Sequence, residues 1–129
     1  MIVDSSALLA ICFQEAEYGI FTDAIMAVND PMIGAPNLVE AFMVVEARGG
    51  QAAGRELDKI VANLGLSVVA FDADHAAVAR EAFRRFGRGR HRAALNFGDC
   101  CAYGLAKSLE LALLFKGNDF ALTDIKPAI

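Results

Sequence analysis

The chain has 129 residues, 56% of them hydrophobic and 22% charged, which is typical of one globular domain spanning residues 1–129 with a sizeable core. No apolar run reaches the roughly 18 residues of a membrane span and no basic segment precedes the N-terminal apolar residues, so we expect a cytoplasmic protein without membrane helix or signal peptide. The net charge of −4 argues against a generic nucleic-acid binder, and the spacing of the three cysteines, which we expect to be buried and reduced, predicts no zinc site or disulfide framework.

The hydrophobic pattern predicts short strands that alternate with longer helices. An apolar strand, Met1 to Val3, leads into a helix that we expect Ser5 and Ser6 to cap and that extends to Phe13. The glycine pair at 49–50 separates two helical stretches. The other elements predicted in this half are a helix at 15–28, a brief strand at 32–34, and helices at 36–49 and 51–64.

The second half of the chain continues the alternation. The nearly continuous apolar run Leu66 to Phe71 favours a strand buried on both faces. We predict a helix at 72–86 with His75 on its surface, a basic loop at 87–96, a helix at 97–109 and a strand at 112–115; the aromatic residues are assigned to the core. Because parallel strands need helical crossovers, the fold class is α/β, with a small central parallel sheet and helices on both faces.

Four acidic residues have positions that suggest a site. Asp4 and Asp119 follow the first and last strands, and ligands bind at the carboxyl ends of parallel strands. Glu40 interrupts an apolar helix, and Asp99 lies near a helix start, where the helix dipole favours an anion. Two carboxylates about 4 Å apart repel by roughly 4 kcal/mol at an effective dielectric constant of about 20, and a divalent cation would offset this. Oxygen-only ligands favour Mg²⁺ or Mn²⁺, which promote attack on phosphodiesters.

Each of these acids also has a purely structural interpretation. Asp4 is equally well explained as a helix N-cap, and Asp99 as a residue that answers the helix dipole. Asp119 fits a turn, and Glu40 fits a helix position that faces solvent. The pattern alone therefore favours a metal site only modestly over four unrelated structural acids.

The stretches MIVDSSALLAI, APNLVEAFMVVEAR, LNFGDCCAYGLAK and LLFKGNDF resemble the motifs of PIN-domain ribonucleases, most closely the VapC toxins of bacterial type II toxin–antitoxin pairs. The resemblance covers essentially the whole chain. It implies a PIN-like three-layer sandwich, a homodimer, a VapB-like antitoxin that blocks the site, and a Mg²⁺- or Mn²⁺-dependent endoribonuclease that cuts tRNA or other structured RNA. It further implies that the motif acids are Asp4, Glu40, Asp99 and Asp119, with Asp124 as the alternative for the fourth.

Two polar residues match the same motifs. Ser6 stands two residues after the first acid, where its hydroxyl either orients Asp4 or a metal-bound water, or caps the helix. Asn96 precedes the third acid and either caps its helix or holds Asp99 in place. The sequence leaves both alternatives open.

Basic residues are concentrated in one segment of this acidic chain. Six of the 12 Lys and Arg residues fall between positions 80 and 92. Those on the preceding helix suit its C-terminal dipole, whereas Arg88, Arg90 and Arg92 are the stronger candidates for contacts with RNA phosphates. Lys116, beside the fourth motif, either touches a phosphate or closes the strand end, and His91 is a possible member of the basic loop.

Two other classes of protein remain as alternatives. A phosphoacceptor receiver domain also places acids at strand ends, with Asp72 as the only candidate acceptor, but the first strand lacks the acid pair that such a site needs. A catalytically inactive PIN scaffold that only binds a partner is the second alternative.

Overall fold

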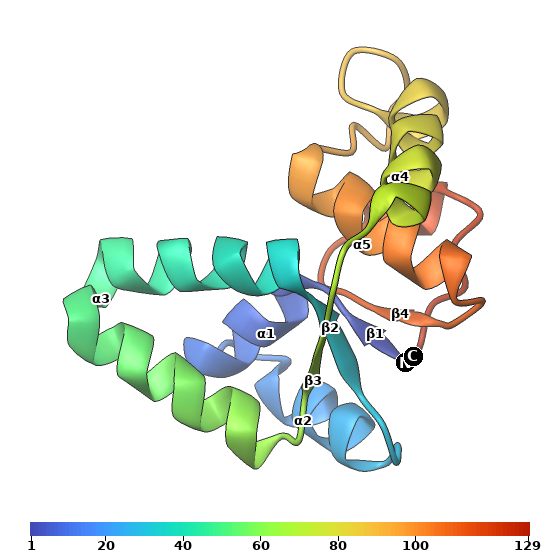
Figure 1. Ribbon diagram of the computed structural model, residues 1–129. Coiled ribbons are helices and arrows are strands. Elements are labelled where there is room, and N and C mark those ends of the chain that lie inside the picture. Colours follow the sequence, from blue (N-terminus) through green and yellow to red (C-terminus); the bar gives the residue numbers. More distant parts are fainter.

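The computed structural model describes residues 1–129 as three layers, with a central sheet between two groups of helices (Figure 1). The four strands are parallel and lie in the order β3-β2-β1-β4. They are β1 (Ile2–Val3), β2 (Met32–Gly34), β3 (Ser67–Val69) and β4 (Leu113–Leu114). Helices α1 (Ser5–Cys12), α2 (Tyr18–Met26) and α3 (Ala35–Asn63) cover one face, and α4 (Ala73–Phe86) and α5 (Phe97–Ser108) cover the other. This arrangement confirms the predicted α/β fold class.

Strand β1 contributes to both hydrophobic cores. Ile2 packs in the core beneath α4 and α5, whereas Val3 packs in the core beneath α1, α2 and α3. Both residues are fully buried, as expected for successive side chains that point to opposite faces of a sheet. Asp4 comes next, so the central strand ends directly on a carboxylate.

Helix α3 contains the predicted interruption at the glycine pair. Gly50 has φ 67° and ψ −166° inside the run Ala35–Asn63, so two helical halves meet at a kink and the second half turns back at an angle to the first (Figure 1). A positive φ favours glycine because it has no Cβ atom. None of the helices has the length and apolarity needed to cross a bilayer.

The prediction of a strand at 66–71 that is buried on both faces was wrong. The strand β3 comprises only Ser67–Val69, and Ser67 and Val68 are exposed. It lies at the edge of the sheet and pairs with β2 alone, so it lacks neighbours that would cover both of its faces. The sequence at 66–71 is apolar partly because Leu66 and Phe71, which lie just outside the strand, pack against the two cores.

Two helix starts differ from the predictions. Asp4, not a serine, is the N-cap of α1, and its side chain accepts the amide of Ser6. His75 is buried rather than at the surface, and its Nδ1 accepts the amide of Asp72 at 3.1 Å in the capping box of α4. Asp72 in turn accepts the amides of residues 74 and 75, so it is occupied as a helix cap.

Helices α4 and α5 approach each other closely at Gly104. A Cβ atom there would lie 2.8 Å from the carbonyl oxygen of His75 and 3.0 Å from Ala79. We expect Gly104→Ala to lower the free energy of unfolding by about 1–3 kcal/mol, because the added methyl group forces the helices apart. Urea unfolding measures this change.

The same substitution at Gly19 is the matched control. Gly19 lies in α2 with open space where a Cβ atom would be, so Gly19→Ala should raise the free energy of unfolding by about 0.5–1 kcal/mol. Equal effects at the two positions would contradict the packing argument.

Candidate metal centre

Asp4 is a buried acid at the carboxyl end of the central strand. The residue is 2% exposed, and its Oδ2 accepts the Ser6 hydroxyl at 2.5 Å and the Ser6 amide at 3.0 Å. Burial raises the pKa of Asp4 to about 7 against the lowering effect of the Ser6 hydrogen bonds, and the charges of Asp99 and Glu40 raise it further. The helix-cap role of Asp4 therefore does not exclude a place among the other acids, because Asp4 caps α1 and also interacts with Asp99 and Glu40.

Glu40 reaches the same region from the first half of α3. Its Oε2 accepts the hydroxyl of Ser5 at 3.1 Å, next to Asp4 in the chain. A Cβ atom at Gly98 would collide with the Glu40 carboxylate, so α3 and the start of α5 approach as closely as a glycine permits. The half-buried Glu40 thus faces the start of α5 rather than open solvent.

Asp99 lies in the first turn of α5, where it forms a capping box with Asn96. The Asp99 amide donates to Asn96 Oδ1 and the Asn96 amide donates to Asp99 Oδ2, both at 2.9 Å. Burial raises the pKa of Asp99, and the charges of Asp119 and Glu40 act in the same direction, whereas Arg88 acts against it. Asn96 therefore both caps the helix and holds Asp99, so both of its proposed structural roles are present.

The structure distinguishes the two candidates for the fourth acid. Asp119 is exposed in the loop after β4, and its charge acts on Asp99. Asp124 instead accepts the hydroxyl of Tyr103 at 2.5 Å and forms ion pairs with a basic side chain of α4 and another of α5. The acids that interact electrostatically are Asp4, Glu40, Asp99 and Asp119.

This donor set has the chemistry of a site for a hard divalent cation. All four acids offer carboxylate oxygens, which hard cations prefer. In each acid at least one of these oxygens accepts no hydrogen bond, except in Asp4, where the second oxygen accepts only the long 3.4 Å bond from Asn37. No three acidic, His or Cys side chains converge on a single point that could hold a metal ion. The role of these carboxylates as metal ligands stays a prediction.

The sequence reasoning missed Asn37, which joins three parts of this site. It is 1% exposed, and its Nδ2 donates to the Gly98 carbonyl at 3.0 Å and to Asp4 Oδ1 at 3.4 Å. Asn37 precedes Glu40 by three residues, so the two share one face of α3, and that spacing is the signal that could have identified it. A buried amide with these partners fixes the start of α5 against the end of β1.

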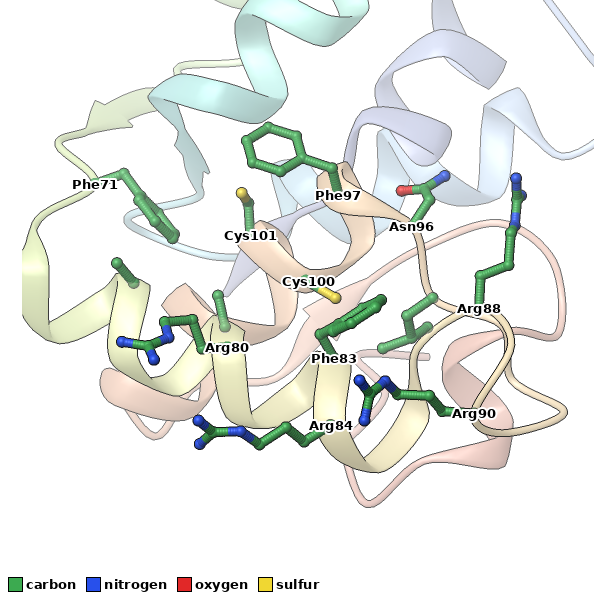
Figure 2. Close-up of a pocket in the computed structure, with 13 residues that line it drawn as sticks. Phe71, Arg80, Phe83, Arg84, Arg88, Arg90, Asn96, Phe97, Cys100 and Cys101 are labelled. Atoms are coloured by element: carbon green, nitrogen blue, oxygen red, sulfur yellow. The ribbon is translucent and has the colours of Figure 1, made fainter.

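The basic loop at 87–96 carries exposed arginines close to the acids. Arg88 lies near enough to Asp99 for its charge to oppose the rise in the Asp99 pKa that burial causes, and Figure 2 shows the Arg88 side chain beside Asn96. The guanidinium of Arg90 stacks over an aromatic ring of α4 at 5.0 Å, and Arg92 is exposed without an ion pair. The roles of these arginines in RNA binding stay predictions.

Lys116 is already ion-paired within the protein, whereas a phosphate contact needs an unpaired cation. Its ammonium group forms ion pairs with Glu15 and with Glu17, the latter at 3.4 Å. Its backbone amide donates to Ser6 Oγ at 3.0 Å. Lys116 is thus engaged by both its side chain and its main chain.

An apolar groove adjoins the acids between α3, α4 and α5. Phe97 is 81% exposed, so the assignment of the aromatic residues to the core was wrong for this ring. It was also wrong for Tyr18, Phe83 and Phe42, which are 49%, 42% and 38% exposed. Phe97 directly follows the N-cap of α5, and its ring lies at the margin of the pocket drawn in Figure 2. The groove consists of two adjoining pockets that share Phe71 and Phe97; Phe83 lines one of them, and Val39 and Met43 line the other.

Comparisons with known proteins agree on one family. The family described as "PIN domain" matches residues 1–126. Ribonuclease VapC30 of Mycobacterium tuberculosis is 45% identical over 125 residues, which are 97% of this chain and 95% of that protein. Ribonuclease VapC of Mycolicibacterium smegmatis is 44% identical over 127 residues, 97% of each. The crystal structure of Mycobacterium tuberculosis VapC20, a "Sarcin-Ricin loop cleaving toxin", matches with a TM-score of 0.75 over 98% of each chain at 17% identity, and confirms the predicted PIN-like fold.

The raised pKa of Asp4 predicts a pH-dependent stability of the metal-free protein. Since the folded pKa of about 7 exceeds the ordinary value of 3.8, protonated Asp4 favours folding at low pH, and this contribution is lost as the pH rises toward about 7. We expect Asp4→Asn, which keeps an N-cap acceptor, to be more stable than the parent at about pH 8 by on the order of a few kcal/mol. The difference should be smaller at about pH 5.

Unfolding in EDTA at the two pH values measures this effect. Asp58→Asn, at an exposed position of α3, is the control and should show no such pH-dependent gain. An Asp4→Asn variant that differs from the parent equally at both pH values would contradict the burial argument.

Proposed function

Because the chain belongs to the PIN-domain family and, within it, to the VapC ribonucleases, we propose that it is a metal-dependent endoribonuclease and the toxin of a type II toxin–antitoxin pair. It hydrolyses RNA phosphodiester bonds beside its four acids. The observation that carries the proposal is the 2% exposed Asp4 at the end of β1, whose carboxylate accepts the Ser6 hydroxyl and whose pKa is raised by burial and then by the charges of Asp99 and Glu40.

The cofactor we propose is Mg²⁺ or Mn²⁺. Asp4, Asp99 and Asp119 would hold it, and Glu40 would bind it or orient the attacking water. When bound, such an ion stabilises charge on a phosphoryl oxygen and makes water a better nucleophile. The protein's own contribution is orientation, because Ser6 fixes the Asp4 carboxylate through two hydrogen bonds.

The substrate we propose is tRNA or another structured RNA in the cytoplasm. Arg88, Arg90 and Arg92 would contact phosphates on either side of the cut, and their charge compensates locally for the acidic chain. Of these three arginines, Arg88 is the one whose charge acts on Asp99. Contacts of this kind position RNA without reading its bases.

Two protein partners complete the proposal. A VapB-like antitoxin would block the site, in keeping with the toxin–antitoxin assignment. A second copy of the chain would cover the apolar groove, where Val39, Met43 and Phe97 are 56%, 64% and 81% exposed. Exposed apolar side chains gathered in one place are typical of protein interfaces.

The alternatives have less support. The receiver alternative needs Asp72 as phosphoacceptor, but Asp72 is the N-cap of α4 and follows the edge strand β3. The inactive scaffold predicts no saturable Mn²⁺ binding, and all four acids of the PIN motifs are present in this chain. The endoribonuclease is therefore the better-supported function.

Substitution of Asp4 tests the proposed chemistry. We expect Asp4→Asn to lose at least about 100-fold in RNA cleavage, because it removes an anionic ligand while the helix cap is retained. EDTA should abolish cleavage by the parent, and Mn²⁺ should restore it. Cleavage of labelled RNA and circular dichroism measure activity and fold in the same samples.

Asp58→Asn should cleave RNA at the parental rate, since it changes an exposed acid on α3. Parental activity in Asp4→Asn, or full activity in EDTA, would refute the assignment.

A charge in the apolar groove tests the proposed dimer. We expect Met43→Glu to convert the dimer to a monomer, because a buried unpaired carboxylate at an interface is strongly unfavourable. Light scattering after size-exclusion chromatography gives the mass of each species.

Ile20→Glu is the matched control, because Ile20 on α2 does not line the apolar groove and is 61% exposed, close to the 64% of Met43. A monomeric parent, or an intact dimer in Met43→Glu, would exclude the groove as the interface.

A further inference from the structure

We infer that Lys116, Glu15 and Glu17 form a tether that positions the Ser6–Asp4 pair, and that Lys116 is not a ligand of the RNA phosphates. The inference rests on the proposed function and assigns a role to three charged residues outside the four acids. Lys116 acts in this scheme as a positioning residue, because its effect on the reaction passes through Ser6.

The first part of the tether is an ion-pair cluster between distant segments. Lys116 follows β4, whereas Glu15 and Glu17 lie in the turn between α1 and α2. The ammonium group pairs with both carboxylates, and the three side chains are only 36%, 36% and 43% exposed. The hydrogen bond from Lys116 to Glu15 is the main cause of the raised pKa of the lysine. The cluster therefore joins the end of β4 to the end of α1.

The second part is a directed hydrogen-bond chain. The Lys116 amide donates to Ser6 Oγ at 3.0 Å, and the Ser6 hydroxyl donates to Asp4 Oδ2 at 2.5 Å. A serine hydroxyl has a single proton to donate. Because Ser6 Oγ accepts the Lys116 amide, its own proton points toward the Asp4 carboxylate. The backbone position of Lys116 thus sets the direction of the strongest side-chain hydrogen bond that Asp4 receives.

The charges favour a tether over a phosphate ligand. One ammonium group between two carboxylates leaves the cluster with a net negative charge, which repels rather than attracts an RNA phosphate. A phosphate would have to displace both carboxylates to reach Lys116. By contrast, Arg92 is exposed without an ion pair and is free to make such a contact.

Three variants separate the two roles. Lys116→Ala removes the tether from one side, the double variant Glu15→Gln/Glu17→Gln removes it from the other, and Lys116→Arg retains the charge. The matched control is Lys59→Ala, which removes the exposed Lys59–Glu56 ion pair on α3. For each protein we would measure Mn²⁺ affinity by calorimetry without RNA, kcat and KM for cleavage, and the salt dependence of RNA binding.

If Lys116 positions Ser6, removing the lysine and removing its two carboxylate partners should have the same effect on Mn²⁺ affinity and kcat. Lys116→Ala and the double variant should each lose about tenfold in Mn²⁺ affinity and in kcat, as is typical when a partner that orients a ligand is removed. KM and the salt dependence should stay at parental values, because no phosphate contact is lost. Lys116→Arg should recover most of the loss, and Lys59→Ala should match the parent.

A phosphate ligand predicts opposite results. Lys116→Ala would then raise KM and lower the salt slope by about one, with Mn²⁺ affinity unchanged, whereas the double variant would lower KM by releasing the lysine. That pattern, or parental Mn²⁺ affinity and kcat in both variants, would overturn the inference. A parent that binds no Mn²⁺ and cuts no RNA would instead overturn the proposed function, and the inference with it.

Discussion

Removal of the Asp4 carboxylate from water is the constraint on which the site depends. A charge in the protein interior is costly unless it is paired and hydrogen-bonded, and the chain places this acid at the end of its central strand, 2% exposed. Ser6 and Asn37 supply polar hydrogen atoms, but no basic side chain forms an ion pair with Asp4. The nearest charges are instead those of other acids. Burial and these like charges both oppose the ionised form of Asp4, so the placement of this acid lowers the stability of the folded protein.

The helical elements and the fold class could be predicted because they depend on local patterns. Apolar periodicity located the helices, and the glycine pair marked the kink that Gly50 makes in α3. The acids could be found because each follows a strand or interrupts an apolar stretch. The prediction that they lie close together rests on a general property of parallel sheets, whose strand ends lie at one edge.

The remaining features depend on contacts between segments that are far apart in the sequence. Nothing local shows that Lys116 meets Glu15 and Glu17 about 100 residues away. The burial of His75 depends on α5, which packs against the His75 main chain at Gly104, and the exposure of Phe97 depends on which neighbours α5 has. The choice between Asp119 and Asp124 likewise needed the partners of Asp124, which α4 and α5 provide.

The two residues of β1 also determine how finely the acid is placed. Ile2 belongs to one core and Val3 to the other, so a shift of the strand by a single residue would exchange the two side chains between cores of different shape. The packing of both cores opposes such a slip, and Asp4 is the next residue along. Hydrophobic packing on both sides of the sheet therefore fixes the position of the first acid, although neither Ile2 nor Val3 contacts it through a polar group.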